Sequence, residues 1–69
     1  MVQIVHHQKT NGYSFQNPET GRFYPLSICG YWAGRYDVWH RFPTHSTKAG
    51  TFENLGDAVA WVMQAIDHL

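Results

Sequence analysis

The hydrophobic pattern of this chain changes its period near residue 51. Before that point, aromatic residues alternate with polar ones between turns marked by glycine and proline. After it, one amphipathic segment runs from Leu55 to Leu69. A period of two is typical of strands, and a period of about 3.6 is typical of a helix. The sequence therefore predicts an α+β fold: a small antiparallel sheet of three to four strands, arranged as a meander and packed on one face by a single C-terminal α-helix.

The length of the chain limits its organisation. Its 69 residues predict a single domain (residues 1–69), with the sheet in residues 1–50 and the helix in residues 51–69. A domain of this size has a core that is only just sufficient, which leaves a homodimer open as an extra source of buried area. Cys29 is the only cysteine, and a lone thiol fits a reducing compartment. With no long apolar run, we expect a cytoplasmic protein with no membrane association.

The alternating pattern of the first part predicts its strands and loops. The expected strands are residues 1–7, 13–16, 22–29 and 35–42. Pro25 lacks a backbone donor, which places its strand at an edge of the sheet or breaks it. Residues 30–34 are expected to form a loop that carries Tyr31 and Trp32, and residues 44–50 a polar connector.

Two turns are expected between the first strands. Asn11-Gly12 is the strongest two-residue hairpin signal, because both central residues of a type I′ turn need a positive φ. In residues 17–21, Pro18 presets φ and Gly21 can adopt the left-handed conformation that closes a bulged hairpin. Both turns favour antiparallel pairing of strands that follow one another in the chain.

The last part predicts one helix with a defined start. Asn54 is a good N-cap, and Asp57 completes an acidic variant of the capping box and complements the helix dipole. Trp61 falls on the flank of the helix, where it either wraps over the sheet edge or meets a partner. An apolar stripe wide enough to cover one face of a small sheet is formed by Leu55, Ala58, Val59, Val62, Ile66 and Leu69.

The sequence carries no signature of catalysis or metal binding. His6 and His7 point to opposite faces of a strand, His40 and His45 flank a bend, and no pair has the spacing of a zinc site. Cys29 has no local signature of a nucleophile, and the five carboxylates are dispersed. We therefore expect a protein that is not an enzyme and has no catalytic residue, no metal and no cofactor.

One parity of the strand predicted at residues 35–42 is the most suggestive surface. It carries Arg35, Trp39 and Arg41, and the preceding loop adds Tyr31 and Trp32. Aromatic and arginine side chains are favoured at the centres of protein interfaces. The same side chains can stack on bases and contact phosphates. The alternative interpretation is that the aromatic residues shield the sheet backbone and one another.

The charge pattern bears on the class of partner. The formal net charge is zero, but residues 1–50 carry +3 and residues 51–69 carry −3. Nucleic-acid binders usually show a clear basic excess, because contacts to phosphates supply most of their non-specific affinity. A protein partner is therefore the first expectation, and nucleic acid is the alternative.

Two resemblances extend this interpretation. The stretch from Phe52 to Val62 resembles the strand-to-helix junction of small sheet-plus-helix domains, among them the arm-type DNA-binding domains of phage integrases. That resemblance implies DNA binding by the sheet. In size and in its lack of an active-site signature, the chain is also similar to compact inhibitors encoded by phages, including anti-CRISPR and other counter-defence proteins. This similarity of format implies an inhibitor that binds a protein through the aromatic and arginine face.

Overall fold

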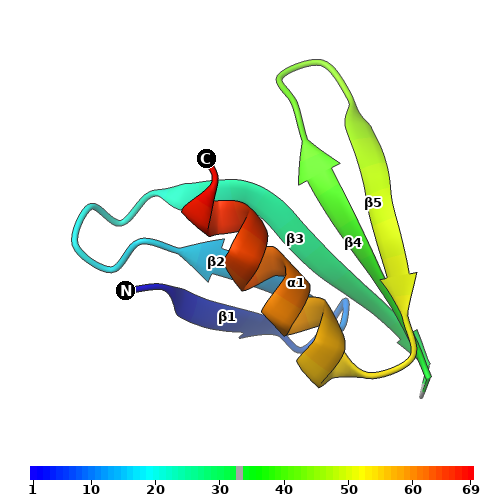
Figure 1. Cartoon of the computed structure of the whole chain (residues 1–69). Helices are drawn as coiled ribbons and strands as arrows, with labels where there is room; N and C mark the ends of the chain where they lie inside the picture. The colour runs from blue at the N-terminus through cyan, green and yellow to red at the C-terminus, as the bar shows by residue number, and fades with distance from the viewer. Residues whose placement is uncertain (33) are drawn as a thin grey trace.

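The computed structural model describes residues 1–32 and 34–69, which form a five-stranded sheet and a helix. The sheet has the order β1-β2-β3-β4-β5, and every neighbouring pair is antiparallel (Figure 1). This confirms the α+β meander with a helix on one face, but the sheet has five strands instead of the three to four expected. The elements are β1 (Gln3–His7), β2 (Gly12–Gln16), β3 (Phe23–Trp32), β4 (Arg35–Arg41), β5 (Ser46–Phe52) and α1 (Leu55–Asp67).

The additional strand is β5, which occupies most of the segment predicted to be a polar connector (residues 44–50). It pairs with β4 along its length, with Lys48 opposite Trp39 and Ser46 opposite Arg41. The register shifts between Val38 and Trp39, which marks a bulge in the ladder. β5 is an edge strand of small and polar residues, so its sequence lacks the apolar alternation that identifies a half-buried strand.

β3 differs from the prediction in its length and in its place in the sheet. It continues through Tyr31 and Trp32, which were expected in a loop, and Trp32 lies opposite Arg35. β3 is flanked by β2 and β4, so Pro25 does not mark an edge. Pro25 is tolerated because it precedes Leu26, the first residue paired with β4, and lies where the β2 register shifts. The ladder therefore loses little from the missing donor.

The two predicted turns are present, but the first has a different form. Asn11 has a positive φ of 53°, whereas Gly12 does not and is the first residue of β2. The connection is a longer loop (residues 8–11), because His7 pairs with Gly12. Gly21 does adopt the left-handed conformation, with a φ of 75°, as the second turn was expected to require.

The helix begins as predicted and covers one face of the sheet. The Asn54 side chain accepts a hydrogen bond from the Asp57 backbone N–H at 2.8 Å. The helix ends at Asp67, so Leu69, predicted as the end of its apolar stripe, is exposed. Trp61 extends over the edge of the sheet toward Phe52, with ring centroids 6.5 Å apart. The core between helix and sheet consists of Phe15, Leu26, Ile28, Val38, Ala58 and Val62.

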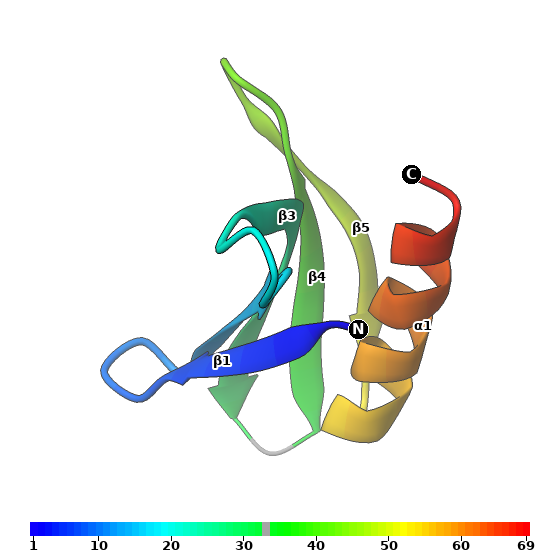
Figure 2. The ribbon, with the colours of Figure 1, turned by 90° about the vertical axis from the view of Figure 1, so that its left-hand side faces the viewer.

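The layering leaves one side of the sheet without a helix in the described residues. α1 packs against β3, β4 and β5, and Figure 2 shows it on a single side of the sheet. No helix in residues 1–32 and 34–69 combines the length and apolar character needed to cross a bilayer. The uncovered side is where the predicted binding residues belong.

Candidate functional site

The side of the sheet opposite α1 is called here the open face. Ile28 and Val38 pair with each other under the helix, so their strand neighbours Ser27 and Trp39, which also pair, point to the opposite side. The same alternation and register place further side chains there from all five strands. The open face includes His7, Ser14, Ser27, Cys29, Asp37, Trp39, Arg41, Lys48 and Thr51.

At one end of the open face, Arg35, which shares the side of Asp37 on β4, forms an aromatic–arginine cluster with Tyr31 and Trp32 of β3. The Arg35 guanidinium carbon lies 4.8 Å from the centre of the Tyr31 ring and 5.3 Å from that of Trp32. Consecutive strand residues normally point to opposite faces, but the register shifts between Gly30 and Trp32. This bulge brings both rings to the same arginine. Tyr31 is 48% exposed and Trp32 is 61% exposed, so the cluster holds two aromatic surfaces in solvent.

The buried carboxylate of Asp37 binds the guanidinium of Arg35. Asp37 has no exposed surface, and its oxygens accept hydrogen bonds from Thr51 at 2.8 Å and from Arg35 at 3.3 Å. The Lys48 ammonium lies 3.8 Å from the same carboxylate. Burial alone would raise the pKa of Asp37, but these hydrogen bonds and positive charges outweigh burial and lower the pKa below 3.8. Asp37 is therefore ionised at neutral pH and fixes the orientation of the arginine.

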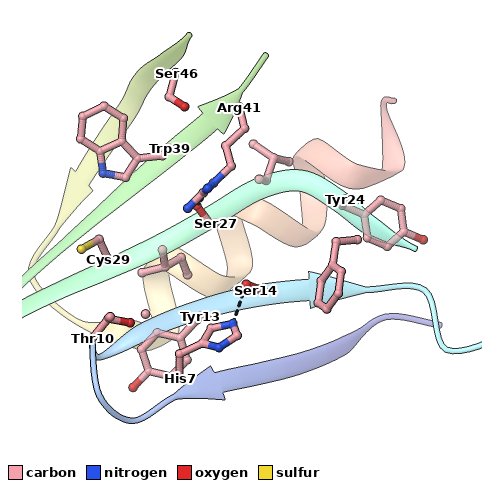
Figure 3. Close-up of a pocket in the computed structure, with 14 residues that line it drawn as sticks. His7, Thr10, Tyr13, Ser14, Tyr24, Ser27, Cys29, Trp39, Arg41 and Ser46 are labelled. Carbon is pink, nitrogen blue, oxygen red and sulfur yellow. Dashed lines mark hydrogen bonds between the residues drawn. The ribbon is translucent and has the colours of Figure 1, made fainter. Parts of the chain in front are cut away.

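Further along the open face, the strands surround a hollow of about 660 Å³. Figure 3 shows Trp39 and Arg41 of β4 on one side, Ser27 and Cys29 of β3 in the middle, and β1 and β2 on the other side. The lining combines four aromatic side chains, one guanidinium and several hydroxyls; the aromatic ones are Tyr13, Phe23, Tyr24 and Trp39. It is therefore suited to binding a polar group that carries an apolar stem.

Hydrogen bonds orient the polar side chains of the hollow. Arg41 Nε donates to Ser27 Oγ at 3.1 Å. On the side of the hollow opposite Arg41, His7 Nε2 of β1 and Ser14 Oγ of β2 are hydrogen-bonded to each other at 2.8 Å (Figure 3). Trp39 is half-buried, with its indole on the open face rather than in the core. The hollow is therefore partly preorganised.

The five residues predicted to bind a partner all lie outside the core, but in two groups. Tyr31, Trp32 and Arg35 form the aromatic–arginine cluster, and Trp39 and Arg41 line the hollow. The sequence prediction did not include the other side chains of the hollow, most of which come from four further strands: β1, β2, β3 and β5. The sequence offered one indication of them: they occupy the strand positions that alternate with the apolar core positions. The missed residues include His7, Ser14, Ser27, Cys29 and Ser46.

The titratable groups offer no metal centre in the part of the chain that is described. No three His, Cys, Asp or Glu side chains of residues 1–32 and 34–69 lie close enough together to hold an ion.

Hydrogen bonding and charge interaction with Cys29 raise the pKa of Tyr31 above 10.0. Tyr31 therefore presents a neutral hydroxyl at physiological pH.

No protein-family model, curated protein or solved structure matches this chain. The assignment of a function therefore depends on the geometry and charge of the open face.

Proposed function

We propose that this protein is a small, non-catalytic module that binds another protein through its open face. The observation that carries the proposal is the aromatic–arginine cluster, in which Arg35 lies against two exposed aromatic rings and is fixed by the buried Asp37. Aromatic and arginine side chains dominate the energetic centres of protein interfaces. A cluster already held in place loses little conformational entropy when a partner covers it.

The exposed apolar area supports the same conclusion. Besides Tyr31 and Trp32, Phe23 is 56% exposed and lines the hollow. Large aromatic side chains that remain in solvent beside a polar hollow are typical of interaction sites. A module of this kind would act by covering a surface of its partner, in the manner of compact phage-encoded inhibitors.

Nucleic acid is the second candidate, favoured by one feature of the open face. Its exposed strand charges, Arg35, Arg41 and Lys48, are all positive, while Asp37 is buried. Phosphate contacts make affinity fall steeply with salt, so a gel shift with a duplex at about 50 mM and about 200 mM salt tests this candidate. Binding that resists the higher salt, or no shift at either concentration, counts against nucleic acid.

The protein-binding proposal is tested by affinity capture with matched tryptophan variants. Wild-type protein, Trp32→Ala and Trp61→Ala are used as baits in lysate of the source organism, and captured proteins are identified by mass spectrometry. Trp61 is the control, because it is 38% exposed but lies on α1.

The expected partner is captured by wild type and by Trp61→Ala, and lost with Trp32→Ala. Titration calorimetry with the purified partner then measures the loss, which we expect to exceed about tenfold for an interface anchor. Equal capture by both variants would show that the aromatic–arginine cluster does not bind the partner. Circular dichroism confirms that each variant is folded.

A further inference from the structure

We infer that the hollow on the open face binds an acidic side chain of the partner, with its carboxylate on Arg41 and its stem beside Trp39. The inference rests on the proposed function, because it names the chemistry by which the same face recognises a protein. It follows from the distribution of charge on the open face and from the way Arg41 is held.

Arg41 is the arginine of the open face whose charge is not balanced. Arg35 and Lys48 both pair with Asp37, at 3.3 and 3.8 Å. Among residues 1–32 and 34–69, no carboxylate forms an ion pair with Arg41. Asp37 satisfies two cations and leaves the third available for a ligand.

The hydrogen bond to Ser27 prepares Arg41 for a carboxylate. Ser27 accepts from Nε at 3.1 Å, so both terminal nitrogens of the guanidinium remain available. Two such nitrogens match the two oxygens of a carboxylate in a bidentate pair. Ser27 is itself buried and paired opposite Trp39. The sheet therefore limits the rotation of the guanidinium and directs it along the hollow, as Figure 3 shows.

The surroundings of Arg41 favour an acidic side chain over other groups. The indole of Trp39 offers an apolar surface for the methylene groups, and the Ser46 side chain lies opposite Arg41 on β5. His7 lines the far side of the hollow. No carboxylate of the described residues lines the hollow, and the charge of the neighbouring Asp37 is balanced by Arg35 and Lys48.

The charge pattern favours a protein carboxylate over a nucleic-acid phosphate as the anion that binds Arg41. A nucleic acid presents a row of phosphates and needs several cations along its path, whereas this hollow contains one unbalanced arginine. The chain as a whole has a net charge of zero. The acidic residues Asp57 and Asp67 lie on α1, behind the sheet, and add no attraction for a polyanion.

A peptide-display selection tests the inference directly. Random 12-residue peptides displayed on phage are selected on the wild-type protein, and the enriched peptides are synthesised and measured by fluorescence anisotropy. We expect them to share an Asp or Glu whose replacement by Asn or Gln weakens binding about tenfold to a hundredfold, as expected for a charged hydrogen-bonded pair. Arg41→Gln should cause the same loss, and combining both changes should add little.

Arg22→Gln is the matched control, because Arg22 is exposed and lies outside the strands. It removes the same charge and should change the affinity less than about threefold, since exposed charges at a distance are screened by salt. Ser27→Ala should weaken binding less than Arg41→Gln, because it releases the guanidinium without removing it.

The failing outcomes separate this inference from the proposed function. Peptides that bind without an acidic residue, depend on Trp32 and ignore Arg41→Gln would overturn the acidic pocket and retain protein binding. Failure to select any peptide would overturn both. A duplex that binds instead, and is weakened equally by Arg41→Gln and Arg22→Gln, would replace both with nucleic-acid binding.

Discussion

Arg35 donates a hydrogen bond to the buried carboxylate of Asp37, two residues away on the same face of β4, at 3.3 Å. The Asp37 side chain is 1% exposed, whereas the Arg35 side chain is 38% exposed. A charge inside the sheet thus holds a charge at its surface. Thr51 of β5 donates a hydrogen bond to the same carboxylate. The orientation of Arg35 therefore depends on the pairing of β4 with β5.

Replacing Asp37 with Asn should change both the stability and its dependence on pH. At pH 7 the variant should be less stable by about 2 kcal/mol, because the hydrogen bonds lose their charged acceptor. The pKa of Asp37 is lowered in the folded state relative to 3.8. Its contribution is therefore present above that value and is lost as the pH falls through the lower folded pKa.

Urea unfolding from pH 7 to pH 2 measures this linkage. The stability difference between wild type and Asp37→Asn should shrink below about pH 4. A difference that stays constant across the whole range would show that folding does not lower the pKa of Asp37.

Trp39 and Val62 should separate binding from stability. Val62→Asp places a charge in the core, where Val62 has no exposed surface, and should leave the domain unfolded, as expected for an unpaired buried charge. Trp39→Ala removes a half-buried side chain from the open face and should leave a cooperative thermal transition while weakening partner binding. Thermal melts followed by circular dichroism compare them. A comparable loss of folding in both variants would mean that Trp39 acts as a core residue.

Removing the helix cap should weaken the domain modestly. Asn54→Ala loses the acceptor for the Asp57 N–H and should cost about 1 kcal/mol. Gln64→Ala is the control, because Gln64 is exposed on the same helix and should change the stability by less than about 0.5 kcal/mol. Chemical denaturation at constant pH makes the comparison. If both variants lose the same stability, the cap contributes nothing specific.

Gly30 should not tolerate a side chain. A Cβ there would lie 2.6 Å from Asn11 Nδ2 and 3.1 Å from Asn11 O, so Gly30→Ala should destabilise the protein by about 1–3 kcal/mol. The matched control is Gly56→Ala in the first turn of α1, where a Cβ meets only Asn54 Oδ1 at 3.5 Å. That change should stabilise the helix by up to about 1 kcal/mol. Urea titration measures the change in the free energy of unfolding for both variants. A Gly30→Ala variant as stable as wild type would contradict the close packing of Gly30 against Asn11.

The sequence was sufficient to predict the fold class and the helix start. The period change at residue 51 and the Asn54 cap both correspond to features of the structure. β5 was missed because an edge strand of small and polar residues buries too little apolar surface to show alternation. The position of Pro25 misled for a related reason: a register shift in the neighbouring strand accommodates it, and such shifts leave no local mark in a single sequence.

The candidate site was predicted only where it follows one strand. Arg35, Trp39 and Arg41 share a parity of β4, so their common face follows from the period of a strand. The hollow is built from several strands and depends on register, which a single sequence does not provide. The link between Asp37 and Thr51 was not anticipated either, because Thr51 belongs to a strand that was not predicted. The bulge that brings Tyr31 and Trp32 together on Arg35 likewise has no sequence signature.

The meander order of the strands has a consequence for how the chain reaches this structure. Each strand pairs with its neighbour in the sequence, so every ladder can form by closing a short loop, at a small cost in chain entropy. Only the helix must return across the sheet, to β3, β4 and β5. Folding should therefore proceed by consecutive hairpins that the helix then locks together.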